Sequence, residues 1–387
     1  MPLTIGVPLE KAPGERRVSL VPAHIPTLLT AGFQVLIEPG AGAAAGYPDA
    51  EYVAKGAVAA SSRKDLFAKS DVILAVRSGA AQPQDSVADA KLYREGQILI
   101  GMLDPWQAHE SFKVLLEKKA TAFAMELIPR TTRAQAMDVL SSQANLSGFK
   151  GVIMAADLLP KIFPMMMTAG GTITPAKVFV LGAGVAGLQA IATAKRLGAL
   201  VSAFDVRSAA KEQVESLGAK FITFDVGDAS AAGGYAKELT PEQQAKQKEL
   251  MAEYLRKQGI DVIVSTAAIP GRPSPKLITE AMVQSLAPGS VIIDLASERG
   301  GNCELTVPGE TVVRHGVTVV GPLGVPSRAA YHASQLYSKN ISTFLLNLLN
   351  KEKQLVVNKE DDIVAATLIT HQGKPGNEKN AAALGLV

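Results

Sequence analysis

A glycine-rich turn between two patterned segments constrains the fold more than any other stretch of the sequence. Residues 178–181 form a continuous apolar run, which is typical of a buried parallel strand. Gly182, Gly184 and Gly187 follow at the G-x-G-x-x-G spacing of a dinucleotide-binding turn. The first glycine permits the tight turn, the second lets the backbone approach a pyrophosphate, and the third lets the next helix pack against the strand. N–H groups at the start of that helix would then face the anion.

The residues after the turn bear on which nucleotide binds. A helical pattern over residues 188–197 ends at Gly198, and residues 200–204 predict a second strand. Asp205 lies 18 residues beyond Gly187. This is near the ~20 residues at which an acid hydrogen-bonds the adenosine ribose and repels a 2′-phosphate. NAD(H) is favoured, while Arg207 leaves NADP(H) open because an arginine here can accommodate that phosphate. The predicted contacts are Gly182, Ala183, Gly184, Val185, Gly187, Asp205, Val206 and Arg207.

The composition indicates a globular protein of more than one domain. The 387 residues, 47% of them hydrophobic and 19% charged, suffice for two or three cores. Because 39 basic residues balance 36 acidic ones and no basic cluster contains interleaved aromatics, nucleic acid is not an expected partner. Cys303 is the only cysteine, which excludes an intramolecular disulfide and a multi-cysteine metal site. No metal cofactor is expected.

Membrane insertion must be considered because the mean hydropathy is +0.17. The N-terminal residues lack a basic region followed by an apolar stretch, so no secretion signal is predicted. The most apolar window, residues 178–194, contains three glycines, Gln189 and Thr193, and residues 163–167 are too few to span a bilayer. We therefore expect no membrane-spanning segment.

Strand and helix patterns alternate along the chain. Alternation of this kind predicts parallel sheets covered on both faces. The fold class expected is α/β, with two Rossmann-like, doubly wound parallel-sheet domains joined by long helices. The predicted strands cover residues 3–7, 34–38, 71–76, 97–100, 120–125, 178–181, 200–204, 220–224, 261–265, 291–294 and 317–320, with helices at 64–68, 108–118, 188–197, 209–217 and 241–258.

Two long helical patterns suggest how the domains are connected. One covers residues 137–163, with Gly148 as a possible bend, and leads into the glycine turn. The other, residues 331–350, would return the chain to the first domain. The predicted domains are therefore residues 1–144 plus 328–387 and the NAD(H)-binding residues 145–327. Residues 371–387 are expected to form a flexible tail.

Three further segments are candidates for ligand contacts. The Gly- and Ala-rich connection 225–239, which contains Gly234 and Tyr235, is long enough to predict a mobile lid. Ala268 follows the strand 261–265, at the carboxyl end where ligands bind in such sheets. Residues 129–145 concentrate arginines, glutamines, hydroxyls and an acid. From spacing alone, this last segment is either an exposed polar loop before a helix or a component of a site.

These motifs together resemble the soluble NAD(H)-binding component, the alpha subunit or domain I, of the proton-translocating NAD(P) transhydrogenases. A more distant resemblance is to alanine dehydrogenase. The similarity covers about residues 3–349 and is carried by residues 14–18, 125–130, 133–135, 138, 141–142, 182–187, 233–237, 269–271 and 300–303.

The resemblance implies roles for four residues in the 129–145 segment. Arg130, Gln135, Asp138 and Ser141 would form a loop at the nicotinamide and make up the catalytic group. Gln135 would lie between the two nicotinamide rings when an NADP(H)-bearing partner docks, and the other three would orient the carboxamide. Hydride would pass directly between the two C4 atoms, so positioning would supply most of the catalysis and no general acid or base is required.

The resemblance also implies partners and a location. We expect a homodimer, peripheral on the cytoplasmic face of the inner membrane. It would dock on the transhydrogenase membrane subunits and on the beta subunit that carries NADP(H). Proton translocation would then belong to those subunits. Tyr235 would lie on a mobile loop over the nucleotide, and Asp205 would contact the adenosine ribose.

Alanine dehydrogenase is the rival enzyme, and it needs side-chain chemistry. Its family uses a lysine after the third N-terminal strand and a histidine after the next one to hold and protonate a keto acid. Ala75 and Asp104 stand at the matching positions of this sequence. Arg17 matches the residue that would bind a substrate carboxylate, but it also fits the transhydrogenase pattern. A catalytically inactive NAD-sensing module is a third alternative.

Overall fold

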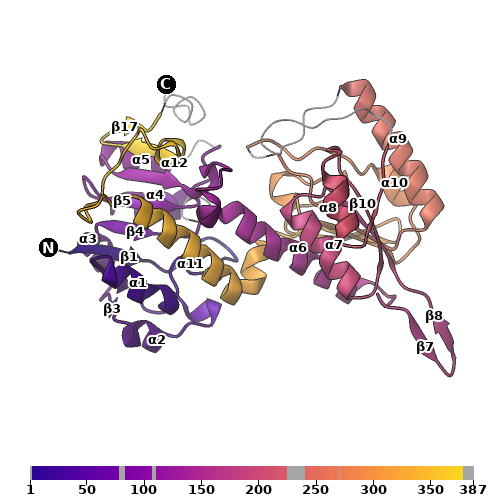
Figure 1. The fold of residues 1–387 in the computed structure, drawn as a ribbon, viewed down its shortest axis with the longest axis horizontal. Coiled ribbons are helices and arrows are strands. Elements are labelled where there is room, and N and C mark those ends of the chain that lie inside the picture. The colour runs from indigo at the N-terminus through magenta and orange to yellow at the C-terminus, as the bar shows by residue number, and fades with distance from the viewer. Residues whose placement is uncertain (1, 78–82, 107–109, 225–239, 270, 378–387) are drawn as a thin grey trace. The chain divides into compact units, whose positions relative to one another are not determined.

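A computed structural model describes residues 2–77, 83–106, 110–224, 240–269 and 271–377, and only the backbone of residues 83–86. The chain forms two compact units (Figure 1). Unit 1 contains residues 1–143 and 327–387, and unit 2 contains residues 144–326. The chain passes from unit 1 into unit 2 within one long helix, α6 (Val139–Leu158).

Unit 1 is built on an eight-stranded sheet with the order β17-β16-β6-β5-β4-β1-β2-β3. The strands from β6 to β3 are parallel, and their order, with β1 between β2 and β4, is that of a doubly wound nucleotide-binding fold. The strands are β1 (Leu3–Val7), β2 (Phe33–Ile37), β3 (Val58–Ala59), β4 (Val72–Leu74), β5 (Ile98–Gly101), β6 (Thr121–Ala124), β16 (Leu368–His371) and β17 (Lys374–Pro375).

Alternate residues of these strands face two apolar layers, as the pleat of a strand requires. Val72 and Leu74 pack with α1 (Ile25–Thr30), α11 (Ala330–Asn347) and α12 (Asp362–Thr367). Ile73, between them, packs with α3 (Arg63–Lys69) and α5 (Glu110–Glu117) on the other face. The described residues of this unit also form α2 (Asp49–Ala54) and α4 (Pro83–Ala90).

Unit 2 repeats this plan in a seven-stranded sheet with the order β11-β10-β9-β12-β13-β15-β14. Here β9 lies between β10 and β12, and only the edge strand β14 is antiparallel. The strands are β9 (Lys177–Leu181), β10 (Leu200–Phe204), β11 (Lys220–Phe221), β12 (Val262–Ser265), β13 (Val291–Asp294), β14 (Thr311–Arg314) and β15 (Val317–Val320).

Helices cover both faces of the second sheet as well. Val178 and Val180 pack with α6, α7 (Val185–Arg196) and α8 (Ala210–Ser216), whereas Phe179 and Leu181 pack with α9 (Pro241–Gln258) and α10 (Glu280–Gln284). Gly148 lets α6 approach α7, because a Cβ there would lie 2.1 Å from the carbonyl oxygen of Ala186. This glycine thus serves close packing, and α6 ends at Leu158, shortly before Pro160.

The predicted fold class is confirmed, because both units hold mostly parallel sheets with helices on both faces. The prediction of a flexible tail from residue 371 was partly wrong. β16 pairs antiparallel with β6, and β17 pairs with β16, so residues 368–375 extend the first sheet. A second element that the sequence patterns did not predict is the hairpin of β7 (Met166–Thr168) and β8 (Gly171–Ile173).

No helix within the described ranges is both long enough and apolar enough to cross a membrane.

Candidate functional site

The glycine turn joins β9 to α7 through backbone geometry that side chains would obstruct. Gly182 has a φ of +93°, a region that L-residues with a Cβ rarely adopt. A Cβ on Gly187 would lie 1.8 Å from the carbonyl oxygen of Gly182, so this glycine lets α7 start directly against the strand. Both positions behave as expected of a dinucleotide-binding turn.

The start of α7 provides a place for an anion. Gly184 is the N-cap residue, no side chain caps the helix, and Leu188 N–H is bonded to Gly184 O at 2.8 Å. The N–H groups before Leu188 belong to the first turn, which has no intrahelical acceptors and carries the positive end of the helix dipole. A Cβ on Gly184 would have no atom within 4 Å, so the described chain leaves space beside this residue. A pyrophosphate fits this combination of space and donors.

Asp205 lies at the end of β10, next to the turn. Its Oδ2 accepts the Ala183 N–H at 2.7 Å, and its Oδ1 accepts the Arg207 N–H at 2.8 Å. The Arg207 side chain donates from Nε and Nη2, each at 2.9 Å. Burial alone would raise the pKa of Asp205, but these hydrogen bonds outweigh it and leave the pKa below its ordinary value. The carboxylate is therefore ionised at neutral pH and able to accept a ribose hydroxyl.

The loop after β12 adjoins the same turn. The Thr266 hydroxyl donates to Gly182 O at 3.0 Å and lies 3.3 Å from Leu181 O. Ala268 is exposed two residues further along. The structure thus brings the glycines, Asp205 and the predicted Ala268 loop to the carboxyl ends of β9, β10 and β12, all in unit 2.

The four residues expected at the nicotinamide lie in unit 1. Gln135 begins a short 3-10 helix, η5 (Gln135–Met137), and its side chain is exposed, as is that of Arg130. Asp138 caps the start of α6: its carboxylate accepts the Ser141 N–H at 2.9 Å and the Ser141 hydroxyl at 2.6 Å. Asn340 of α11 holds the segment from behind, with Nδ2 donating to Ala136 O at 2.8 Å.

The residues 129–141 thus have a local structural role that sequence spacing could not separate from a functional one. Asp138 and Ser141 bond to each other as a helix cap would require, whatever else they bind. Gly234 and Tyr235 lie outside the described residues.

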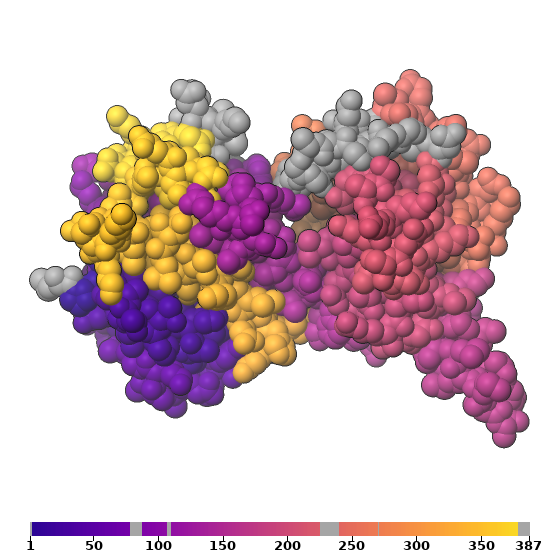
Figure 2. Space-filling view, in the orientation of Figure 1, coloured from indigo at the N-terminus to yellow at the C-terminus, as the bar shows by residue number. Residues whose placement is uncertain are grey.

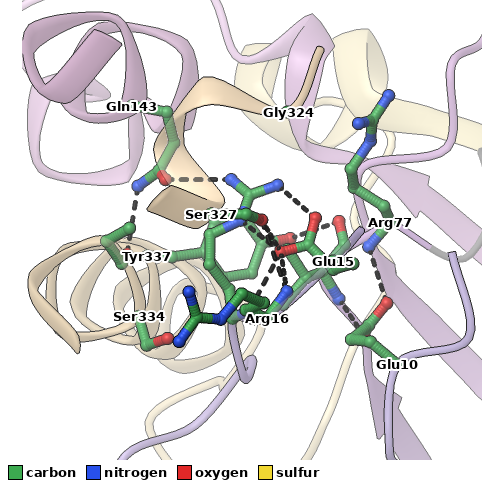
Figure 3. Close-up of polar contacts among 12 residues, drawn as sticks. Glu10, Glu15, Arg16, Arg77, Gln143, Gly324, Ser327, Ser334 and Tyr337 are labelled. Carbon is green, nitrogen blue, oxygen red and sulfur yellow. Dashed lines mark hydrogen bonds and ion pairs between the residues drawn. The ribbon is translucent and has the colours of Figure 1, made fainter. Parts of the chain in front are cut away.

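A buried ion pair surrounds Arg17 (Figure 3). Its Nε and Nη2 donate to the two carboxylate oxygens of Glu15 at 2.7 and 2.6 Å, and Nη1 donates to Gln143 Oε1 at 2.9 Å. The Ser327 hydroxyl also donates to Glu15. Burial raises the pKa of Glu15, but the Arg17 bonds outweigh it and hold the pKa below its usual value. An internal carboxylate therefore already occupies the guanidinium that could bind a substrate carboxylate.

The positions matching the lysine and histidine of alanine dehydrogenase offer no equivalent chemistry. Ala75 is buried, and its carbonyl accepts the Tyr337 hydroxyl at 2.8 Å. Asp104 has a φ of +52°, and its N–H donates to Glu126 at 2.8 Å. Neither side chain provides a nitrogen able to donate a proton to a keto acid.

Sequence reasoning missed two carboxylates that hold loops at the carboxyl ends of the first sheet. Glu10 accepts the N–H groups of Val76 and Arg77, and Glu126 accepts those of Leu103 and Asp104. Burial raises the pKa of each carboxyl to about 7. No motif marks them, because each partner lies at least 22 residues away in sequence. Among the described residues, no group of three or more His, Cys, Asp or Glu side chains is arranged to hold a metal ion.

Comparison with known families agrees with this geometry. Residues 6–147 match "Alanine dehydrogenase/PNT, N-terminal domain", and residues 151–378 match "Alanine dehydrogenase/PNT, C-terminal domain". The chain belongs to the alanine dehydrogenase/PNT family. The two matches together cover both units.

Within this family, the chain is similar to an NAD(P) transhydrogenase alpha subunit of Rhodospirillum rubrum. The two are 49% identical over 377 residues, which is 96% of this chain and 97% of the relative. It is 29% identical to the alanine dehydrogenase of Methanococcus maripaludis, over 98% of this chain and 96% of that protein. The resemblance to the transhydrogenases expected from the motifs is confirmed.

Solved structures give the same order. The crystal structure of transhydrogenase from Sinorhizobium meliloti superposes with a TM-score of 0.85 at 46% identity, covering 96% of this chain and 99% of that one. An L-alanine dehydrogenase superposes with a TM-score of 0.79 at 26% identity, covering 99% of both chains.

Proposed function

We propose that this chain is the NAD(H)-binding component of an NAD(P) transhydrogenase. The observation that carries the proposal is the 49% identity to a transhydrogenase alpha subunit across nearly the whole of both chains. The glycine turn and Asp205 support it, because they supply an anion site and an ionised acceptor in the places where a dinucleotide needs them. The acid favours NAD(H) over NADP(H) at this site.

Two sets of residues would hold the nucleotide. The adenosine, pyrophosphate and adjoining ribose would contact Gly182, Ala183, Gly184, Val185, Gly187, Asp205, Val206, Arg207, Gly234, Tyr235 and Ala268. The nicotinamide would contact Arg130, Gln135, Asp138 and Ser141. The exposed side chain of Gln135 is suited to contact with a second nucleotide carried by a partner. We propose that these side chains position the rings, since hydride transfer between them requires alignment and no proton donor.

NADH supplies the hydride from C4 when bound, and NADP⁺ on the partner beta subunit would receive it. The protein groups around Gln135 are arranged for positioning. Asp138 is engaged with Ser141, and Asn340 fixes Ala136, so the short helix η5 presents Gln135 on a supported backbone. Coupling to proton translocation would belong to the membrane subunits, with this chain peripheral on their cytoplasmic side.

The proposal includes a homodimer. The hairpin β7–β8 stands out from the body of unit 2 (Figure 2). Its Met167 is 80% exposed, and Met165, Met166 and Ile173 are also exposed. Exposed apolar side chains on one projecting element are typical of an interaction surface. A second copy of the chain is the occupant we propose.

Alanine dehydrogenase is the alternative function. The family description and the 29% identity to an alanine dehydrogenase favour it. Ala75 and Asp104 oppose it, because neither replaces the missing lysine and histidine. The bond of Arg17 to Glu15 opposes it as well, since a keto acid would have to compete with a buried carboxylate for the same guanidinium.

A single assay separates the two functions. The chain is mixed with NADH and an NADP(H)-binding domain of a transhydrogenase loaded with NADP⁺, and NADPH formation is followed. A parallel sample receives pyruvate and ammonium in place of the second domain. NADPH formation without turnover of pyruvate supports the proposal. Turnover of pyruvate and ammonium alone would replace it with alanine dehydrogenase.

A further inference from the structure

The side chain of Asn302 is buried in unit 2 and bonded to the loop after β12. Its Oδ1 accepts the Ala267 N–H at 3.0 Å. Its Nδ2 donates to Ala267 O at 2.8 Å and to Pro275 O at 2.9 Å. The residue has no exposed surface. One amide group therefore engages both polar backbone groups of Ala267 and uses both of its own N–H donors.

Asn302 is itself held firmly. Its carbonyl accepts the N–H groups of Leu277 and Ile278 at 2.8 and 3.0 Å. The next residue, Cys303, donates its N–H to Asp294 Oδ2 at 3.0 Å. Gly301, just before Asn302, has a φ of +82°, and a Cβ there would lie 2.4 Å from Asp294 Oδ2. The glycines at 300 and 301 thus allow a turn that side chains would prevent, and the turn fixes the Asn302 amide in place.

The loop that Asn302 holds lies on a definite side of the nucleotide site. β9 carries the glycine turn and lies between β10 and β12. Asp205, at the end of β10, marks the side of the adenosine ribose. A dinucleotide crosses the sheet at this point, so its other half must extend over the end of β12. Ala267 and Ala268 follow β12 directly.

We propose that Asn302 is a positioning residue for the nicotinamide half of NAD(H). It acts through the backbone of Ala267 and fixes the path of the exposed Ala268 beside it. Thr266 fixes the other side of the same loop through its bond to Gly182 O. This inference rests on the proposed NAD(H) site, and it assigns a role to the Gly300–Asn302 turn that the binding residues named above do not include.

The test compares two ligands on the full chain. Asn302→Asp keeps the size of the side chain and its acceptor oxygens but removes both donors. NADH binding is followed by the fluorescence of the nicotinamide, and ADP binding by calorimetry. ADP carries the adenosine and both phosphates but no nicotinamide. We expect the variant to lose about tenfold or more in NADH affinity and to change less than about twofold in ADP affinity.

A control and a second variant guard against an unfolding effect. Thr306→Val removes another buried hydrogen bond to Asp294, at 2.6 Å, without touching the loop after β12, and both affinities should stay as in the unaltered chain. If Asn302→Asp does not fold, Asn302→Ala avoids placing a charge beside the carbonyls of Ala267 and Pro275. The same split between NADH and ADP is expected for it.

The outcomes separate this inference from the proposed function. Equal losses of NADH and ADP affinity would mean that Asn302 supports the unit as a whole, and unchanged affinities would mean that the loop needs no such support. Either result overturns the positioning role. An unaltered chain that binds ADP but not NADH would overturn the proposed function, and the inference with it.

Discussion

Asp205 and Arg207 form a closed pair in which the arginine donates three hydrogen bonds, from its backbone N–H, Nε and Nη2, to the carboxylate two residues before it. The same carboxylate accepts the Ala183 N–H from the glycine turn. Arg207 was the residue that left NADP(H) open in the sequence. In the structure its guanidinium is engaged by an acid, which reduces what it can offer a 2′-phosphate.

Asp205→Asn should therefore weaken NADH binding and narrow the preference against NADPH. The variant loses a charged acceptor for the ribose hydroxyl and also loosens Arg207, which then becomes available to a phosphate. We expect about a 10- to 100-fold loss in NADH affinity, because hydrogen bonds to charged groups contribute about 1.5–3 kcal/mol. Titrations with NADH and NADPH measure both effects. An unchanged ratio of the two affinities would contradict this role for the acid.

Two glycines of the turn should respond to alanine in opposite ways. Gly187→Ala places a Cβ 1.8 Å from Gly182 O, so it should lower the melting temperature and nucleotide affinity together. Gly184→Ala meets no atom within 4 Å, so it should leave the melting temperature unchanged and weaken NADH binding alone. Thermal melts with and without NADH test the pair. Normal NADH affinity in Gly184→Ala would show that no pyrophosphate approaches this residue.

Gln135→Asn should slow hydride transfer far more than it weakens NADH binding. The shorter side chain on η5 would no longer reach between the two rings, whereas contacts along the rest of the nucleotide would persist. Single-turnover transfer to a partner-bound NADP⁺ gives the rate, and a fluorescence titration gives the affinity. Gln213→Asn, the same change at an exposed position of α8, is the matched control. Equal losses of rate and affinity would argue against a role confined to transfer.

Stability should fall as the pH rises towards neutrality. Burial raises the pKa of Glu126 from 4.5 to about 7, so between these values the folded chain holds a proton that the unfolded chain releases. The free energy of unfolding therefore decreases with pH over that window. Glu126→Gln removes this contribution, on the order of 3 kcal/mol at most. Urea titrations across this pH range test it, with the exposed Glu117→Gln as control. Parallel pH profiles for all three chains would refute the assignment.

The sequence predicted those regions of the fold that depend on local patterns. The glycine turn, Asp205 and the alternation of strands and helices follow from spacing, because backbone conformation and burial impose residue types within a few positions. β16 could not be predicted this way. It is four residues long, and its place beside β6 depends on a partner more than 240 positions earlier in the sequence.

The candidate site shows the same division. Asp205 was recognised by its distance from Gly187, but its bond to Ala183 required the folded turn. The Arg17 ion pair joins residues near the N-terminus to Gln143, 126 positions later, and Asn302 reaches Ala267 across 35 positions. Such contacts are set by how elements pack in space. The β7–β8 hairpin was missed because its methionine-rich run has neither helical nor strand periodicity.

The central claim is that hydride passes directly from NADH on this chain to NADP⁺ on a partner domain. NADH carrying deuterium at both C4 positions is mixed with the chain and an NADP⁺-loaded NADP(H)-binding domain of a transhydrogenase, and the NADPH formed is analysed by mass spectrometry. We predict one deuterium in every NADPH formed, because no exchange with water intervenes. NADPH without deuterium, or none at all while NADH binds normally, would contradict the claim.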